Sequence, residues 1–259
     1  MMDVLHNREA SGDSGLKKIR SAGRLSAIWQ RIDRIYCISL VDRKDRQACA
    51  RRQFDSVGLS DKVDFHFVHR HPRNSEQGIY ESHQACLKMG LDAGARHVLV
   101  FEDDVVFGPV DADRLSAGID FFMQQKDCSL LLLGCLVGKS HPTQSPFVRR
   151  VRYRCLTHAY LADAPLARKM VETPWQGLAF DAALRHWPDH HFVLYPSIAF
   201  QSNAPTDNTR HLRLDRIRRL FGGMRIIQLA NEHYHRYPVI VIAAHVLVVG
   251  ALMLWIIAG

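Results

Sequence analysis

The sequence lacks the cysteine and histidine patterns that build disulfide or zinc frameworks. Its six cysteines are scattered with no CxxC spacing, and its fifteen histidines include no HExxH or similar ligand pattern. The N-terminal residues MMDVLHNREA are polar and contain no apolar segment typical of an export signal, so we expect none. Reduced thiols are then the default expectation. These absences argue against a disulfide-rich secreted module and against a zinc-binding motif.

Acidic residues are too few to balance the basic ones. Lys and Arg number 34 against 26 Asp and Glu, which gives a net charge of +8. A basic excess suits anionic partners, such as acidic lipid, phosphorylated small molecules or nucleic acid. No aromatic stacking platform or known nucleic-acid module accompanies the arginines, so we expect no nucleic-acid partner. The 47% hydrophobic and 23% charged content is that of an ordinary folded protein, with room for a sizeable core in 259 residues.

Charged residues are missing from one long segment. Residues 237–259 contain no Lys, Arg, Asp or Glu, and their length matches the roughly 20 residues of a bilayer-spanning helix. The sequence therefore predicts a C-terminal transmembrane helix, with a buried core helix as the alternative. The preceding residues 209–236 are predicted as a basic amphipathic juxtamembrane segment, or else a solvated surface helix. Their arginines predict a membrane-anchored protein whose soluble part faces the cytoplasm.

The rest of the chain alternates between strand and helix patterns. Residues 1–33 are expected to form a polar arm and a basic helix. From residue 34 short apolar runs alternate with segments of helical composition, which is typical of an α/β domain with a mostly parallel sheet. We expect this domain to cover residues 34–208. The expected strands are Ile35–Leu40, Val63–Val68, His97–Phe101, Leu130–Leu133, Phe147–Arg154, Leu156–Leu161 and Phe192–Tyr195. The expected helices are Arg43–Val57, Glu81–Ala93 and Pro165–Glu172.

The most informative motif is VLVFEDDVV at residues 98–106. A buried strand ends there in three consecutive acids, Glu102, Asp103 and Asp104. Ligands of open α/β sheets bind beyond the carboxyl ends of strands, and adjacent carboxylates need a cation to offset their repulsion. Hard oxygen ligands suit Mg²⁺ or Mn²⁺, which in turn bind phosphate oxygens. The alternative is an acidic loop balanced by nearby arginines.

Two further segments could line the same site. Residues 38–46, ISLVDRKDR, follow the first strand, where Asp42, Arg43 and Arg46 could meet a ribose or phosphate. The alternative is a helix start with Asp42 as N-cap. Residues 78–83, GIYESH, open a helix, and the adjacent Ser82 and His83 point in different directions. They are therefore site-lining groups or an ordinary helix start, and do not form a nucleophile–base pair.

In this order and spacing, the three segments resemble glycosyltransferase family 25, which includes bacterial lipopolysaccharide galactosyltransferases and collagen galactosyltransferases. The family element I-N-L-D-R-x-x-D-R corresponds to residues 38–46, with Val41 inserted before Asp42. The element G-C-x-x-S-H corresponds to residues 78–83, without the cysteine, and EDD corresponds to residues 102–104. Later matches are Ala159–Tyr160, Asp181 before a helix, and Pro196–Asn208. The resemblance covers roughly residues 34–208.

The resemblance implies a GT-A-like, Rossmann-type fold that transfers a hexose, most often galactose, from a UDP-sugar donor with the help of Mn²⁺ or Mg²⁺. It implies Asp104 and Glu102 as metal ligands, with Asp103 near metal or ribose. Asp42, Arg43, Arg46, Ser82 and His83 would frame the nucleotide. Asp181 would take the proton from the acceptor hydroxyl; its alternative is a helix N-cap. With the apolar tail, the expected acceptor is a glycan or a lipid-linked oligosaccharide such as lipopolysaccharide core.

Three other functions remain open at this stage. The domain could be a catalytically inactive, membrane-bound scaffold, although a dead site need not keep three adjacent acids. It could be another metal-dependent phosphate enzyme such as a nucleotidyltransferase, although no second acidic pair is evident. A nucleic-acid-binding protein is the third, because of the net charge of +8.

Overall fold

The structure, a computed structural model, describes residues 23–187, 189–203 and 222–258 of the chain. Of the arm and helix predicted over residues 1–33, the described part is helical over residues 23–29. The arginine-rich stretch 212–221 lies outside the described residues, as does the end of the polar segment that was matched to the family at Pro196–Asn208.

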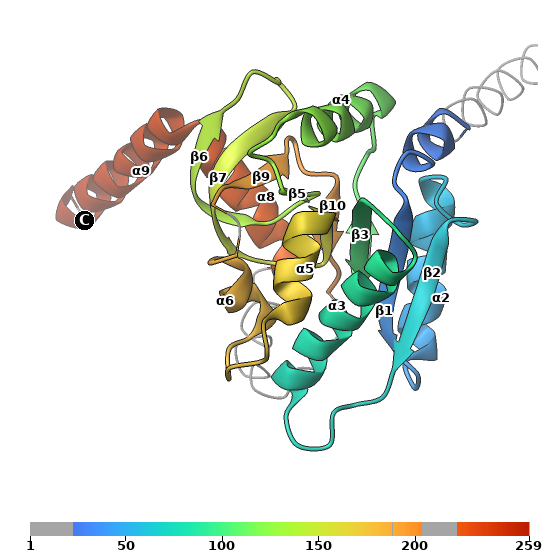
Figure 1. Cartoon of the computed structure of the whole chain (residues 1–259). Helices are drawn as coiled ribbons and strands as arrows, with labels where there is room; N and C mark the ends of the chain where they lie inside the picture. The colour runs from blue at the N-terminus through green and yellow to red at the C-terminus, as the bar shows by residue number, and fades with distance from the viewer. Residues whose placement is uncertain (1–22, 188, 204–221, 259) are drawn as a thin grey trace, which may run out of the picture.

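A mixed sheet forms the centre of the described part of the chain (Figure 1). Its eight strands follow the order β2-β1-β3-β8-β5-β9-β7-β6. The pairs β1–β2, β1–β3 and β5–β9 are parallel, and the other neighbours are antiparallel. The strands are β1 (Arg34–Leu40), β2 (Val63–Val68), β3 (His97–Glu102), β5 (Leu130–Leu132), β6 (Leu136–Pro142), β7 (Val148–Cys155), β8 (Ala159–Asp163) and β9 (His191–Leu194). A separate antiparallel pair joins β4 (Val105–Phe107) to β10 (Ala199–Gln201).

The predicted mostly parallel sheet is present in β2, β1 and β3, which two crossover helices connect. Elsewhere the sheet is mixed, because β8 runs antiparallel between β3 and β5. β7 and β8, which residues 156–158 link, are not neighbours in the sheet, because β5 and β9 lie between them. Leu156 turns the chain there with a positive φ of 82°, so the strand predicted at Leu156–Leu161 begins at Ala159 instead.

Two apolar layers cover the two faces of the sheet. On one face residues 23–29, α2 and α4 contribute side chains such as Trp29, Phe54 and Leu115. On the other face α3, α5 and α6 contribute Tyr80 and Met170, and α3 and α5 lie next to one another in Figure 1. The helices are α2 (Lys44–Ser56), α3 (Ser75–Asp92), α4 (Ala112–Gln124), α5 (Ala164–Glu172) and α6 (Phe180–Leu184). The sheet is therefore covered on both sides, and its strand ends are left for a site.

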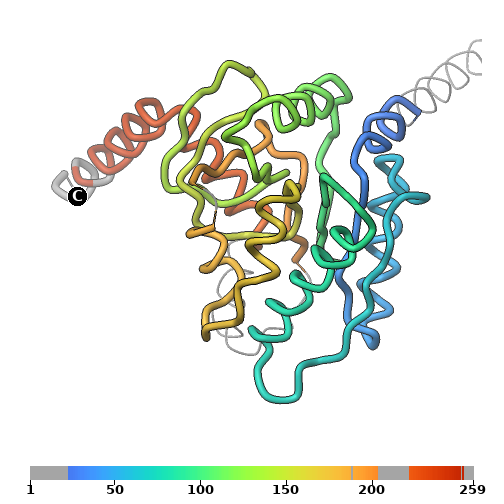
Figure 2. Tube along the Cα trace, in the orientation of Figure 1, coloured from blue at the N-terminus to red at the C-terminus, as the bar shows by residue number. Residues whose placement is uncertain are grey.

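The C-terminal part consists of α8 (Gly223–Arg236) and α9 (Pro238–Ala258). α9 projects from the body on the side opposite residues 23–29 (Figure 2). Its apolar side chains are exposed, for example 78% at Val239 and 73% at Leu247, so the alternative of a buried core helix is wrong. The single transmembrane helix predicted over residues 237–259 is not confirmed, because within the described residues no helix taken singly has the length and apolar character for a membrane crossing. α8 and Pro238–Ala251, bent by 105°, meet those criteria as a pair.

Four of the six cysteines are buried within the apolar core. These are Cys37, Cys86, Cys128 and Cys135, and none of the four forms a disulfide bond. Burial raises the pKa of the Cys86 thiol to about 12, which keeps it protonated and unreactive.

Candidate functional site

A cavity of about 700 Å³ opens at the carboxyl ends of β1 and β3. Its wall comes from the end of β1, Arg46 of α2, and the loops after β2 and β3. The start of α3, the β7–β8 link, α6, the end of β10 and the start of α8 complete it. The loop between β2 and α3 forms the lower edge of the molecule in Figure 1, with α6 beside it on the left. This is where open α/β sheets bind ligands.

The three acids after β3 lie in this cavity, each with its own partners. Asp103 accepts a hydrogen bond from Ser39 Oγ at 2.6 Å and one from Arg46 Nη1 at 3.0 Å. Burial raises the pKa of Asp103, while Ser39 and Arg46 act in the opposite direction. Asp103 is therefore tied to the first strand and the first helix, and its carboxylate is already occupied.

Asp104 keeps one carboxylate oxygen without a partner. Its Oδ2 accepts from Gln201 Nε2 at 2.9 Å, whereas its buried Oδ1 has no hydrogen-bond partner within the described residues. Arg46 lies 3.8 Å from Oδ2. Burial, followed by the charge of Glu102, raises the pKa of Asp104 to about 7. Such a carboxylate favours a nearby cation over ionisation on its own.

Glu102 faces the helix α3 side of the cavity. It accepts from Thr157 Oγ1 at 2.9 Å, and His83 Nε2 lies 3.5 Å from its Oε1. Burial pushes the pKa of Glu102 upward, but His83 and Thr157 outweigh that effect and the net pKa is lowered. His83 itself is buried, stacks on the Phe180 ring with centroids 3.9 Å apart, and contacts the Tyr160 hydroxyl at 3.2 Å.

A divalent cation fits Asp104 if the substrate completes its shell. In the described part of the chain no group of three His, Cys, Asp or Glu side chains is arranged to hold a metal ion. Mg²⁺ in nucleotide sites is usually held by one or two carboxylates together with substrate phosphates and water, so a closed protein cage is not required. The unpartnered Oδ1 of Asp104 is the oxygen that would serve. The same role for Glu102 stays a prediction.

Asp181 lies in the first turn of α6, on the cavity wall opposite β1. The N-cap position is Ala179, so the N-cap alternative for Asp181 is wrong. Its Oδ1 accepts a hydrogen bond from the Tyr153 hydroxyl of β7. Burial raises the pKa of Asp181, and the Tyr153 hydrogen bond partly offsets this. The carboxylate thus lines the cavity with a fixed orientation, as a proton acceptor requires.

A basic rim faces the acids. The loop after β2 has the sequence HRHPRN, and Arg70 and Arg73 line the cavity. His71 Nδ1 accepts from the Asn74 amide at 3.0 Å. Gly78 lets this loop approach α3, because a Cβ there would lie 2.7 Å from the His71 Cβ. The rim supplies fixed positive charge for anionic groups.

The structure brings together most of the residues predicted from the sequence. Arg46, Ser82, His83, Asp181 and the three acids line the cavity. Ser82 Oγ donates to the Gly78 carbonyl at 2.6 Å, which confirms that Ser82 and His83 do not form a catalytic pair.

Asp42 and Arg43 lie outside the cavity lining. Asp42 lies 3.5 Å from Arg70 on the rim, and Arg43 forms a 2.9 Å ion pair with Asp45. The N-cap position of α2 is Arg43, so the alternative that made Asp42 the N-cap is wrong. β1 ends at Leu40, and Val41 lies between that end and Asp42.

The sequence did not predict several residues of the site. Thr157 and His158 follow β7 and Gln201 ends β10, and all three line the cavity. Tyr153 of β7 is not part of the lining but donates a hydrogen bond to Asp181. His158 is buried directly beside Glu102, whose amide donates to the His158 carbonyl at 3.0 Å. No local sequence pattern identifies these residues, because the pairing of distant strands places them at the site. The sequence HRHPR directly after the predicted strand Val63–Val68 could have indicated the basic rim.

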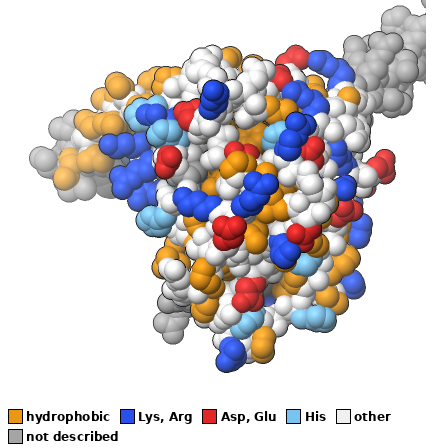
Figure 3. Space-filling model, viewed as in Figure 1, with side chains coloured by type: hydrophobic (Ala, Val, Ile, Leu, Met, Phe, Trp, Pro, Cys, Tyr) orange, Lys and Arg blue, Asp and Glu red, His pale blue; other side chains and the backbone are white. Residues whose placement is uncertain are grey.

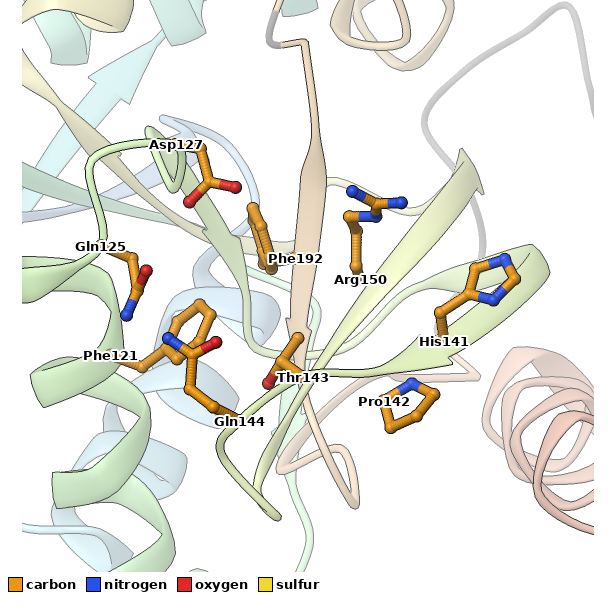
Figure 4. A pocket seen from close by; sticks show the side chains of 9 residues that line it. All are labelled: Phe121, Gln125, Asp127, His141, Pro142, Thr143, Gln144, Arg150 and Phe192. Carbon is orange, nitrogen blue, oxygen red and sulfur yellow. The ribbon is translucent and has the colours of Figure 1, made fainter.

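A second, smaller pocket of about 210 Å³ lies elsewhere, between α4 and the β6–β7 hairpin (Figure 4). The Phe121 and Phe192 rings, Asp127, His141 and Arg150 are among its lining residues. Asp127, His141 and Arg150 are exposed, and no acid cluster adjoins them. Its shallow, surface character makes the cavity at β1 and β3 the candidate site.

Comparison with known proteins finds only distant structural likenesses. No protein-family model matches the sequence, and no curated protein matches it. The protein A197 from STIV matches with a TM-score of 0.43 and 13% identity, over 64% of this chain and 83% of that one. A UDP-glucose pyrophosphorylase complexed with UDP-glucose matches with a TM-score of 0.41 and 8% identity, over 74% of this chain and 84% of that one.

A glycosyltransferase involved in glycosylation of the major capsid of PBCV-1 matches with a TM-score of 0.37 and 12% identity, over 63% of this chain and 82% of that one. All three scores are below 0.5. The functional argument therefore rests on the geometry of the cavity.

Proposed function

We propose that the protein is a metal-dependent glycosyltransferase that moves a hexose from a UDP-sugar to a glycan acceptor. The observation that carries the proposal is the unpartnered, buried Oδ1 of Asp104 in a cavity rimmed by Arg46, Arg70 and Arg73. A buried carboxylate oxygen that has no hydrogen-bond partner among the described residues, in a cavity lined by arginines, suits a divalent ion with a diphosphate. The motif order shared with glycosyltransferase family 25 favours a UDP-sugar over other diphosphates, with galactose as the first hexose to test.

Each group of residues then has a chemical role. Asp104, with Glu102 as the second candidate, would hold Mn²⁺ or Mg²⁺. When bound, the ion neutralises charge that develops on the leaving diphosphate. Arg46 orders Asp103 and Asp104 from the α2 side, and the rim arginines attract the diphosphate. Ser82 and His83 line the wall beside Glu102 and shape the donor pocket.

Asp181 is the proposed proton acceptor. In the transfer, the acceptor hydroxyl oxygen forms a bond to the anomeric carbon and its proton passes to Asp181. The bond from that carbon to the diphosphate breaks, and UDP leaves with the electron pair. The Tyr153 hydroxyl orients the Asp181 carboxylate for this step.

We further propose that the acceptor is lipid-linked, as in a lipopolysaccharide core, and that the enzyme works at the cytoplasmic face of a bacterial inner membrane. The exposed apolar side chains of α9 support membrane attachment. The arginines of residues 209–236 support the cytoplasmic orientation. Attachment would let enzyme and acceptor meet in two dimensions.

The test is nucleotide release by the full chain from a panel of sugar nucleotides, with Mn²⁺, with Mg²⁺ and with chelator. Turnover of one UDP-sugar that requires metal and falls at least 100-fold in Asp104→Asn is expected, because removing a transition-state charge contact costs about that much. Asp64→Asn is the matched control, since Asp64 is an exposed acid of β2 outside the cavity lining.

Two results would redirect the proposal. Metal-dependent UDP-sugar binding without turnover, tested with glycolipid acceptors present, would favour the membrane-bound scaffold. Pyrophosphate release from a nucleoside triphosphate and a sugar phosphate would favour a nucleotidyltransferase. Equal turnover by Asp104→Asn and wild type would contradict the assignment of the metal site.

A further inference from the structure

Two arginines from distant parts of the chain contact the same tyrosine ring where α8 joins α9. Arg149 of β7 and Arg236, the last residue of α8, both lie over the Tyr195 ring, 5.1 and 5.7 Å from its centroid. Arg236 also lies 5.0 Å from the centroid of Tyr237. The Tyr195 hydroxyl beneath them is buried and has no hydrogen-bond partner within the described residues. We call Arg149, Tyr195 and Arg236 the cationic elbow.

The elbow is held in position and, among the described residues, forms no ion pair with an acid. Arg149 Nε donates to Ser140 Oγ at 2.6 Å, which fixes the guanidinium. Glu232 faces Tyr195, but its Oε2 accepts the Ser197 amide at 3.1 Å, and no ion pair links it to either arginine. Two arginine charges that lie 5.1 and 5.7 Å from one ring centroid favour an anion near that ring.

The elbow lies beside two apolar surfaces. α8 contacts the body through one face, where Met224 and Gln228 are buried and Asn231 bonds to Val137. Its opposite face exposes Ile226 by 52% and Leu229 by 37%. α9 continues with exposed apolar side chains, and Figure 3 shows this orange surface with blue Lys and Arg side chains next to it.

The angle between the helices matches a membrane surface. α8 and the first part of α9 are bent by 105°. If α9 stands along the membrane normal, α8 lies within 15° of the membrane plane (105 − 90). The exposed apolar face of α8 and the arginines of the elbow then meet the headgroup region together, as in interfacial helices.

We propose that the cationic elbow binds the headgroup phosphate of an anionic phospholipid, with α8 on the membrane surface and α9 in its apolar layer. We choose an anionic lipid as the partner because the positive charge of the elbow lies where the apolar surface begins. The elbow lies at the opposite end of α8 from Met224, which lines the cavity, about 18 Å away at 1.5 Å per residue. The site is therefore separate from the proposed sugar-nucleotide site and does not depend on the transfer reaction.

The test is flotation of the full chain with vesicles of phosphatidylcholine alone and of phosphatidylcholine with phosphatidylglycerol. The measured quantity is the binding constant for the anionic vesicles divided by that for phosphatidylcholine alone. Insertion of α9 contributes equally to both constants, so its contribution cancels in the ratio. Each arginine near an anionic surface contributes about fivefold, so Arg149→Gln with Arg236→Gln is expected to lower the ratio about 25-fold. The control is Arg150→Gln with Arg152→Gln, which removes equal charge from the opposite face of β7.

Distinct results would overturn the proposal. If both double variants lower the ratio equally, net charge accounts for binding and the elbow is not a headgroup site. If wild type shows no preference for anionic vesicles, another partner, such as a second copy of the chain, covers this surface. Inorganic phosphate is added as a separate arm. A ratio that falls to one at millimolar phosphate would assign the elbow to a soluble phosphate ligand.

Discussion

At the residue scale, burial and the charge of Glu102 raise the pKa of Asp104 to about 7. In the unfolded chain the pKa returns to about 3.9. The folded state therefore holds this proton more tightly, and stability falls as pH rises from about 4 to 7. Asp104 is kept at the cost of stability, which is common at functional sites.

Asp104→Asn is expected to unfold at higher denaturant concentration than wild type at pH 8 with chelator, because the amide never ionises. The gain is up to about 4 kcal/mol, from the size of the pKa shift, and it vanishes below pH 4, where both side chains are neutral. Urea unfolding at the two pH values measures it. A difference independent of pH would show that ionisation of Asp104 is not the cause.

Tyr153 sets the ionisation of Asp181. Burial raises the pKa of Asp181, and the Tyr153 hydrogen bond opposes the rise. Tyr153→Phe is therefore expected to raise the pKa further, so the acidic limb of the pH–activity profile moves to higher pH. The profile of kcat against pH measures this shift. Tyr36→Phe, which removes a hydroxyl outside the cavity lining, should leave the limb in place.

At the element scale, the start of α3 holds the basic rim against the acids. Asn74 caps the helix by accepting from the amides of Glu76 and Gln77 at 2.9 and 3.3 Å. His71 bonds to the Asn74 amide in turn. The predicted helix at Glu81–Ala93 starts six residues earlier, at Ser75. Residues 75–77 are all polar, a composition typical of a loop. The hydrogen bonds from the amides of Glu76 and Gln77 to the Asn74 side chain make this turn helical.

Asn74→Ala is expected to destabilise the fold by about 1 kcal/mol, because two amides lose their acceptor. That corresponds to a fall in Tm of roughly 2–4 °C for a domain of this size. Calorimetry of the full chain measures it. Asn74→Asp keeps an acceptor at the same position and should retain most of the stability. An equal loss in both variants would count against the capping argument.

At the scale of the whole molecule, α9 extends from the body and contacts it through α8. Removal of residues 238–259 is expected to change the Tm of the remaining chain by less than about 2 °C, because the exposed side chains of α9 add little to the core. Thermal unfolding of the two chains in the same detergent tests this. A fall of many degrees would mean that α9 packs against the body.

The sequence predicted the alternation of strands and helices, because the spacing of apolar residues that distinguishes the two is a property of neighbouring residues. The strands at β1, β2 and β3 and the helices α2 and α5 begin within two residues of their predicted starts. The sequence did not predict α4 and β6, because the spacing of their apolar residues was not distinguished from that of the flanking segments. The order of the strands was not readable, because pairing joins residues such as Val98 and Ala162 that are far apart in the chain.

By itself the sequence determined that an acid triplet ends a buried strand, that basic residues outnumber acidic ones, and that residues 237–259 contain no Lys, Arg, Asp or Glu. Those properties belong to neighbouring residues, so periodicity and composition reveal them. Only the tertiary structure decided that Ser39 and Arg46 both bond to Asp103, while one oxygen of Asp104 has no hydrogen-bond partner among the described residues. It likewise brought Tyr153 to Asp181, and both Arg149 and Arg236 to the Tyr195 ring. Burial and partnership depend on contacts between distant segments, and no local pattern encodes them.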